Sequence, residues 1–318
     1  MSPPATPPLN AELSPPGRPA DVGFWQAFAF WLKLGFVSFG GPAGQIAIMH
    51  AELVERRRWI GATEFEDAIA TCNLLPGPAS TQLSIYCAWR VRGRLGALVG
   101  GVAFIVPGLI VILGLAALFL AGSPPRWVLA AGAGAGAAVA AIAVHAGAAL
   151  IPASWQRRTS AVRWSVYLAL GAVAAALLGP WLVVVLLACG VMELVRTTTL
   201  PRFSAHSMPV LAFQTLTLGT LGSLCWVALK VGALSYGGGF VIIPLMQADA
   251  VDHYHWMTGP QFLNAVALGQ ITPGPVVQTV AVVGYAAAGL LGGVLASVVA
   301  FSPSFLFILL GAKHFDRI

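Results

Sequence analysis

The chain has 318 residues, of which 58% are hydrophobic and only 9% are charged, with 17 Lys and Arg against 11 Asp and Glu. A soluble domain carries about 25% charged residues, so this composition excludes a soluble globular protein and predicts an all-α polytopic integral membrane protein. The net charge of +6 forms no basic stripe with interleaved aromatic residues, so it predicts membrane topology and argues against nucleic acid as a partner.

The first 23 residues differ from the rest of the chain, because they are rich in proline and contain no long apolar run. They also lack the basic and apolar regions of a signal peptide. We predict a disordered tail over residues 1–23. A partner-binding PxxP segment is the alternative.

Apolar runs follow this tail, and those at 164–178 and 180–196 are short. They predict membrane spans near residues 24–50, 95–121, 127–150, 164–178, 180–196 and 293–312. This scheme places the tail outside the cell and makes the protein multi-pass.

The first apolar run contains Lys33 and then a glycine-rich break, Ser38 to Gly44. A charged side chain within a span costs about 3 kcal/mol on insertion scales, so Lys33 points to function. Snorkelling of its ammonium group to the interface is the alternative. Glycines let a ligand approach the backbone closely, but they also serve close helix packing.

A Pro-Gly-Pro tripeptide interrupts the next apolar run at residues 76–78 and recurs at 273–275. Proline lacks a backbone N–H and glycine is a poor helix former, so each tripeptide predicts a broken helix. Arginines flank the first interrupted run at 56–58 and 90–94. Because short cytoplasmic loops collect arginine, both flanks belong inside, and residues 64–90 are predicted to enter the membrane and return.

The chain matches itself at a shift of 197 residues. KLGFVSFGG, from Lys33, aligns with KVGALSYGG, from Lys230, and the two Pro-Gly-Pro tripeptides align with each other. We therefore predict two repeats, over residues 24–207 and 208–318. The second repeat has no counterpart of the last three spans of the first.

The charges of the repeats predict opposite orientations. His253, Tyr254 and His255 stand where the first repeat has three arginines, and the counterpart of its second arginine-rich loop, residues 287–291, has no charge. By the positive-inside rule these loops are cytoplasmic in the first repeat and external in the second. The predicted fold is thus a pair of inverted-topology repeats with broken or re-entrant helices at Pro-Gly-Pro.

Inverted repeats with broken helices are typical of secondary transporters, whose substrate site lies near the midplane. The N–H groups and positive dipole end of a broken helix suit an anion, and nearby hydroxyl and amide groups add donors without charge. Hydrogen bonding between helices is the alternative role for these polar groups. The candidate substrate-binding residues are Lys33, Ser38, Gly40, Gly41, Asn73, Pro76, Gly77, Pro78, Ser80, Thr81, Gln82, Lys230, Ser235, Gly237, Gly238, Gln270, Pro273, Gly274, Pro275, Gln278 and Thr279.

Motifs for other chemistry are missing from the sequence. It has no zinc-protease, nucleotide-binding or nucleophile-elbow motif, and its four cysteines form no C-x-x-C. We expect no catalytic residue, no metal and no cofactor. Glu64, Glu66 and Asp67 fit the acidic first turn of a helix, with proton coupling as the alternative.

Several of these motifs resemble the signature of the chromate ion transporter (CHR) family. They are FVSFGGPAGQIAIMHAELVERRRWI, NLLPGPASTQL and GGVAFIVPG in the first repeat, and ALSYGGGFVIIPLM and GQITPGPVVQT in the second. The resemblance covers roughly residues 24 to 318. It implies an inner-membrane protein that exports chromate as a secondary transporter, driven by the membrane potential or by protons, and so gives chromate resistance. It also implies two CHR repeats of opposite orientation, and long members of the family continue beyond the point where this chain stops.

The identity of the ion comes from the resemblance alone, since the residues indicate only a small anion. Sulfate is a tetrahedral dianion like chromate, so a transporter or exchanger of sulfate or another oxyanion is the alternative. A membrane-embedded enzyme is a remote alternative, because it needs a catalytic dyad or metal site. The expected partners are chromate and the lipid bilayer, and a homodimer is left open.

Overall fold

The computed structural model describes residues 22–39, 41–120, 161–177, 219–235 and 242–312, together with isolated positions between 126 and 192. Helices make up the structure of this described part, which contains no strand, so the all-α prediction is confirmed. The proline-rich tail up to residue 21, and most of the spans predicted at 127–150 and 180–196, lie outside the described residues.

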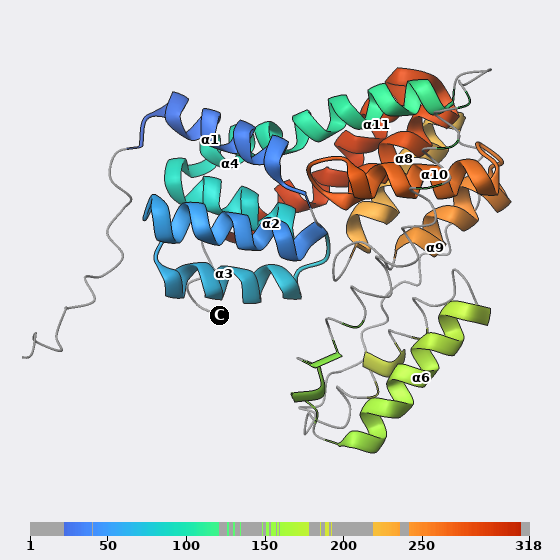
Figure 1. Cartoon of the computed structure of the whole chain (residues 1–318), viewed down its shortest axis with the longest axis horizontal. Coiled ribbons are helices and arrows are strands. Elements are labelled where there is room, and N and C mark those ends of the chain that lie inside the picture. Colours follow the sequence, from blue (N-terminus) through green and yellow to red (C-terminus); the bar gives the residue numbers. More distant parts are fainter. Residues whose placement is uncertain are drawn as a thin grey trace, which may run out of the picture.

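The first half of the chain forms a bundle at one end of the molecule (Figure 1). Its elements are α1 (Phe24–Val37), α2 (Gly41–His50), the π-helical turn η1 (Ala51–Arg56), α3 (Ala62–Leu74) and α4 (Ala79–Phe119). Apolar side chains from all four α-helices share one core, in which Trp31, Phe65 and Phe104 are fully buried.

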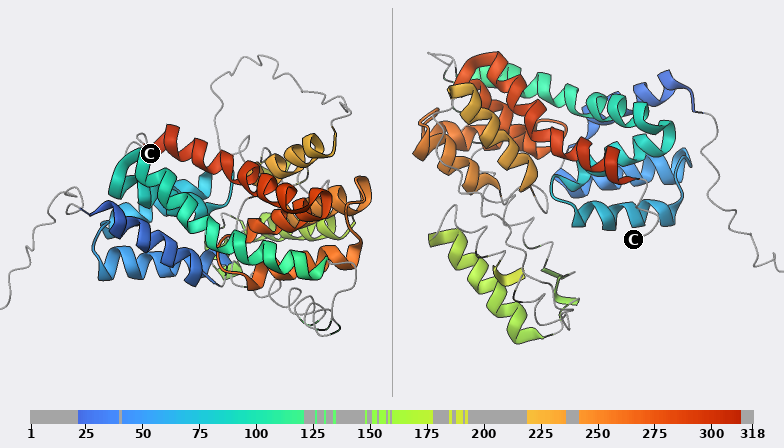
Figure 2. Two further views of the ribbon diagram at one scale, coloured as in Figure 1. Left: turned by 90° about the horizontal axis from the view of Figure 1, so that it is seen from above. Right: turned by 180° about the vertical axis from the view of Figure 1, so that it is seen from behind.

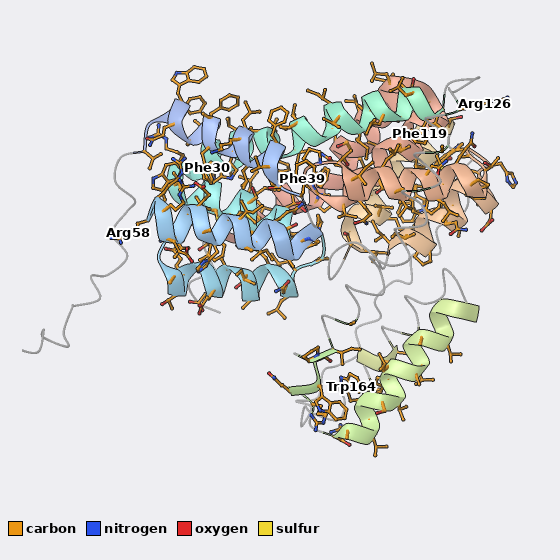
Figure 3. All side chains as sticks on the ribbon, viewed as in Figure 1. Phe30, Phe39, Arg58, Phe119, Arg126 and Trp164 are labelled. Carbon is orange, nitrogen blue, oxygen red and sulfur yellow. The ribbon has the colours of Figure 1, made fainter. Side chains whose placement is uncertain are left out.

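The predicted single span over residues 24–50 is wrong, because α1 ends at Val37 and the chain then reverses. The ring of Trp59 stacks on that of Trp31, with their centroids 6.2 Å apart. Phe30 and Arg58 accordingly lie at the same end of the bundle, and Phe39 lies near the middle of the molecule (Figure 3). The two ends of this segment thus lie at the same end of the first bundle.

Helix α4 is itself folded back at Gly93, where φ is +66°. A Cβ atom on Gly100 would lie 2.6 Å from the Cβ of Ala88. These residues would be about 18 Å apart along a straight helix at 1.5 Å per residue. Residues 79–91 and 94–119 are therefore two antiparallel helices.

The chain from 64 to 90 forms the predicted hairpin, with the break at Pro-Gly-Pro. Helix α3 ends at Leu74 and α4 begins at Ala79. At the far end of the hairpin, Arg90 forms an ion pair with Glu64. The segment thus returns to the end of the bundle at which it starts.

The second half forms another bundle at the opposite end of the molecule (Figure 1). Its elements are α8 (Thr220–Ala233), α9 (Ile242–Gln247), η3 (Ala248–His253), α10 (Gly259–Ile271), η4 (Val276–Gln278) and α11 (Thr279–Gly311). Helix α11 also folds back, at Gly289 with φ +62°. The non-glycine residues with positive φ in the described part are Arg58 and His255, at +53° and +52°.

The long arms of α4 and α11 join the two bundles. The later part of α4 runs to the α8–α11 end, where Figure 3 places Phe119, and the later part of α11 runs back toward α1–α4 (Figures 1 and 2). Where they cross, a Cβ on Gly101 would lie 2.6 Å from the Phe305 ring, and one on Gly293 2.4 Å from Leu113. Glycines thus allow the two arms to pack closely. Helix α6 (Ala161–Leu177) lies apart from both bundles (Figures 1 and 2).

Two helices of the described part, α4 and α11, are long and apolar enough to cross a membrane, with mean hydropathies of 2.8 and 2.2 over their most apolar windows. Shorter apolar helices are found over Phe24–Val37, Ala161–Val173 and Thr220–Ala233. The outer faces of the two long helices expose large apolar side chains, including Leu98, Ile110, Leu291, Val298 and Leu310. Such faces suit a hydrocarbon environment.

Gly232 provides a test of the packing of α8 on α11. A Cβ at this position would lie 2.0 Å from the backbone oxygen of Ala300, so we expect Gly232→Ala to lower the free energy of unfolding by about 1–3 kcal/mol. Gly114→Ala on α4 is the matched control, because nothing lies within 4 Å of its Cβ position. Thermal unfolding of both variants in detergent measures the difference; equal melting temperatures would contradict the packing described.

Candidate functional site

The two Pro-Gly-Pro loops lie where the halves of the molecule meet, and each packs against the opposite half. A Cβ on Gly77 would lie 3.2 Å from Ser304 Oγ of α11 and 3.5 Å from the oxygen of Gly232 on α8. On the other side, the backbone N–H of Gly274 donates to the carbonyl oxygen of Ser38, at 2.9 Å. Each loop is thus enclosed by the half to which it does not belong.

Glycine is required at the centre of both loops. Gly77 has φ +121° and Gly274 has φ +94°, a region that side chains with a Cβ rarely adopt. The prolines on either side restrict the backbone further. Helices α4 and η4 start immediately after the two loops, with Pro78 and Pro275 at their N-caps.

Three glutamine amides cover carbonyl oxygens at or near these breaks. Gln82 Nε2 donates to Pro76 O at 2.7 Å, Gln278 Nε2 to Ile105 O at 2.6 Å, and Gln45 Nε2 to Gly274 O at 2.6 Å. Carbonyl groups left free by a broken helix need such partners. Covering them also reduces the repulsion that an anion would meet at the loops.

Fully buried hydroxyl groups without a hydrogen-bond partner occur in the described part of the chain, on the elements that flank or contact the loops. They belong to Ser38, Thr81, Ser84, Ser235 and Ser304. Buried polar side chains normally have partners, so these hydroxyls need water or a polar ligand as a partner. Each hydroxyl can donate one hydrogen bond, which is what an oxyanion accepts.

The remaining sequence candidates are distributed unevenly. Ser80 and Thr279 are buried in the first turns after the loops, and the Thr279 hydroxyl already donates to Val276 O at 2.9 Å. Gln270 has a buried, unpaired amide nitrogen. Asn73 is exposed on α3, and Gly41 is half-buried with φ +72°. Gly40, Gly237 and Gly238 lie outside the described residues.

The two candidate lysines occupy different environments. Lys230 Nζ lies 2.5 Å from Asp249 Oδ2, and the two side chains are only 19% and 15% exposed. Lys33 is exposed on α1. The residue 197 positions before Asp249 is Glu52, which pairs with Arg56 and Arg57 and leaves Lys33 without an acidic partner in the described part of the chain.

Glu52 forms a cluster of charged side chains with Arg56 and Arg57. Burial opposes ionisation of this carboxyl, but the guanidinium groups of Arg56 and Arg57 outweigh it and lower the pKa of Glu52 below its ordinary value. The planar guanidinium of Arg57 also lies over the rings of Phe30 and Trp59, at 4.8 and 4.9 Å. These contacts attach the loop after η1 to α1.

Sequence reasoning missed Gln45, Ser84 and Ser304. Each is a polar side chain inside an apolar helix, which is the one signal that would have found them. Gln45 lies four residues from the Ser38–Gly41 break, and Ser304 follows Pro303 in the last span. Their relation to the loops depends on contacts between the halves, which the linear sequence does not display.

Comparison with known proteins assigns the chain to a family. The profile of the chromate transporter family matches residues 25–194 and 222–318. The protein belongs to the chromate transporter family. It is therefore a membrane protein of a transporter family, and its relatives are named as transport proteins, not enzymes.

Three curated relatives each match more than nine-tenths of the chain. The chain is 33% identical to the chromate transport protein of Cupriavidus metallidurans, over 92% of its own length and 75% of that protein. It is 30% identical to the probable chromate transport protein of Synechococcus elongatus, over 92% of its length and 76% of the relative. It is 31% identical to the chromate transport protein of Pseudomonas aeruginosa, over 94% of its own length and 74% of that protein. No solved structure matches the chain.

The ion pair of Lys230 predicts that the two lysines contribute unequally to stability. Lys230→Ala leaves the mostly buried Asp249 carboxylate without its cation, so we expect the free energy of unfolding to fall by about 2–4 kcal/mol. Lys33→Ala is the matched control and should change it by less than about 0.5 kcal/mol, because Lys33 is exposed. Unfolding of both variants in detergent measures this, and equal losses would contradict the arrangement.

Proposed function

We propose that the protein exports chromate across the inner membrane as a secondary transporter and so gives chromate resistance. The observation that carries this proposal is that each Pro-Gly-Pro loop contacts the opposite half, and that buried hydroxyls without partners lie on the elements around these contacts. The names of the relatives supply the ion. Sulfate, a dianion of the same shape, is the second candidate substrate.

Hydrogen-bond donors are the chemistry that this site offers to an oxyanion. The hydroxyls of Ser38 and Ser235, at equivalent positions 197 residues apart, would approach it from the two halves, together with those of Thr81 and Ser304. Backbone N–H groups in the first turns after the loops add the positive ends of two helix dipoles. Neutralisation of the dianion's charge by Lys33 and Lys230 is a hypothesis.

The proposal includes two inverted repeats. Elements η1 and η3, and likewise α3 and α10, have bounds that differ by 197 residues, as do the starts of the two family matches. The loop after each π-helical turn repeats the same backbone contacts: Trp59 N–H donates to Leu53 O, and Trp256 N–H to Ala250 O. The two bundles lie at opposite ends of the molecule, and only the first carries the arginines at 56–58 and 90–94.

The proposed membrane arrangement follows from these two ends. The α1–α2 and α3–α4 hairpins would enter from the cytoplasmic side and the hairpins of the second half from the external side, with all four turns near the midplane. Non-helical backbone at that depth is tolerated only where protein or water surrounds it. The long arms of α4 and α11 would cross the whole bilayer.

The membrane potential is a sufficient driving force for export. Moving one elementary charge across 100 mV is worth about 2.3 kcal/mol, so moving a dianion out of a cell whose interior is negative by this amount is favourable by about 4.6 kcal/mol. Coupling to a proton is the alternative drive.

Chromate accumulation in inside-out vesicles tests the function directly. We expect the wild-type protein to accumulate chromate when a lumen-positive potential is imposed. Ser38→Ala and Ser235→Ala should lower Vmax/KM by about tenfold or more, since each removes a hydrogen bond to a charged ligand. Ser302→Ala, an exposed serine bonded to Val299 O, is the matched control and should transport normally.

The same assay separates the alternatives. Two outcomes would favour sulfate as the substrate: excess sulfate abolishes chromate entry, and the vesicles take up labelled sulfate. Lack of wild-type entry of either ion would overturn the proposal. Lys33→Ala belongs in this series, because loss of entry without loss of stability would identify Lys33 as a functional cation.

Thiol labelling tests the orientation of the repeats. Arg58 and His255 are exposed at equivalent positions, so Arg58→Cys and His255→Cys place a thiol at each end of the molecule. A membrane-impermeant maleimide should label His255→Cys in intact cells, and Arg58→Cys only after permeabilisation. The unsubstituted chain gives the background from native cysteines. Labelling of both positions from one side would refute inverted topology.

A further inference from the structure

The two loops are held differently by the halves that enclose them. Both backbone groups of Gly274 are bonded to the first half: its N–H donates to Ser38 O at 2.9 Å, and its oxygen accepts from Gln45 Nε2 at 2.6 Å. Gln278, just after the loop, donates to Ile105 O of α4 at 2.6 Å. Three hydrogen bonds therefore attach the second loop to the first half.

Among the described residues, the first loop has no equivalent of the Gln45 contact. The residue 197 positions after Gln45 is Ile242, which is buried but carries no donor. The Pro76 carbonyl is covered by Gln82 of the same half. Gly77 meets the second half by packing against Ser304 Oγ and the Gly232 oxygen.

We infer that Gln45 is a positioning residue of the substrate site, whose amide fixes the Pro273–Gly274–Pro275 loop in the orientation that binds the anion. This inference rests on the proposed function. Gln45 is 1% exposed, its amide nitrogen donates to the loop, and its buried oxygen, which can only accept a hydrogen bond, has no partner. The partner that the structure shows for Gln45 is therefore the loop.

The hydrogen bonds of Gly274 and Gln278 hold the second loop against the first half. The hydroxyls beside the loops are buried, so exchange of a ligand with water requires them to become exposed.

Three variants of the full chain test this role in the vesicle assay. Gln45→Ile copies the residue at 242 and should raise the KM for chromate about tenfold, with Vmax changed by less than about twofold, since one buried hydrogen bond is lost. Gln45→Glu loses the donor when ionised and regains it when protonated. The KM of Gln45→Glu should fall toward the wild-type value as the pH is lowered. Comparison with Gln45→Ile at each pH corrects for the protonation of chromate itself. Ile242→Leu is the matched control and should leave KM unchanged.

A second measurement does not depend on transport. Val277, next to the loop, is 1% exposed. In a background with Cys189→Ala and Cys225→Ala, Val277→Cys should react with maleimide about tenfold faster when Gln45→Ile is also present, and at an unchanged rate with Ile242→Leu. Faster labelling supports the positioning role even if wild-type vesicles take up no chromate, an outcome that defeats only the proposed function. Unchanged labelling, or a KM in Gln45→Ile equal to that of the wild type, overturns the role.

Discussion

The structure depends on one constraint: a helix that is broken inside an apolar protein must find new partners for its backbone. Each Pro-Gly-Pro loop ends one helix and begins another, so it exposes carbonyl and N–H groups at the centre of the molecule. Glutamine amides cover carbonyls at and near the breaks, and the opposite half encloses each loop. The halves therefore complete each other at the same point where they leave polar groups free to meet a ligand.

Glycine makes this arrangement sterically feasible. Gly77 and Gly274 adopt the positive φ that the loops need, while Gly93 and Gly289 fold α4 and α11 back on themselves. At Gly108 a Cβ would lie 2.1 Å from Pro273 O, so the second loop can approach α4 only because that residue has no side chain. Glycines that look like simple helix breakers in the sequence thus have two roles. Some turn the chain, and others allow the opposite half to pack closely.

The sequence predicted the helical class, both helix breaks and the returning hairpin at residues 64–90, because proline, glycine and flanking arginine act locally. It failed at residues 24–50, where an apolar run long enough for one span is divided near Phe39 into two antiparallel helices. Hydropathy measures apolar length and not direction, so it cannot detect such a reversal. Gln45 and Ser304 escaped notice for a related reason, since their significance comes from partners more than 200 residues away.

The two halves differ in the ion pairs that their equivalent carboxylates form. Glu52 is neutralised by Arg56 and Arg57 at the arginine-rich end, whereas Asp249, 197 positions later and without those arginines, pairs with Lys230. A carboxylate at this position thus needs a cation in either half, and the one available decides whether the lysine on the neighbouring helix is engaged or exposed. The same reasoning applies at the loops, where Gln45 gives the second loop a hydrogen bond and the residue 197 positions later, Ile242, has no side-chain donor. A few side chains thus distinguish the described surroundings of the two loops.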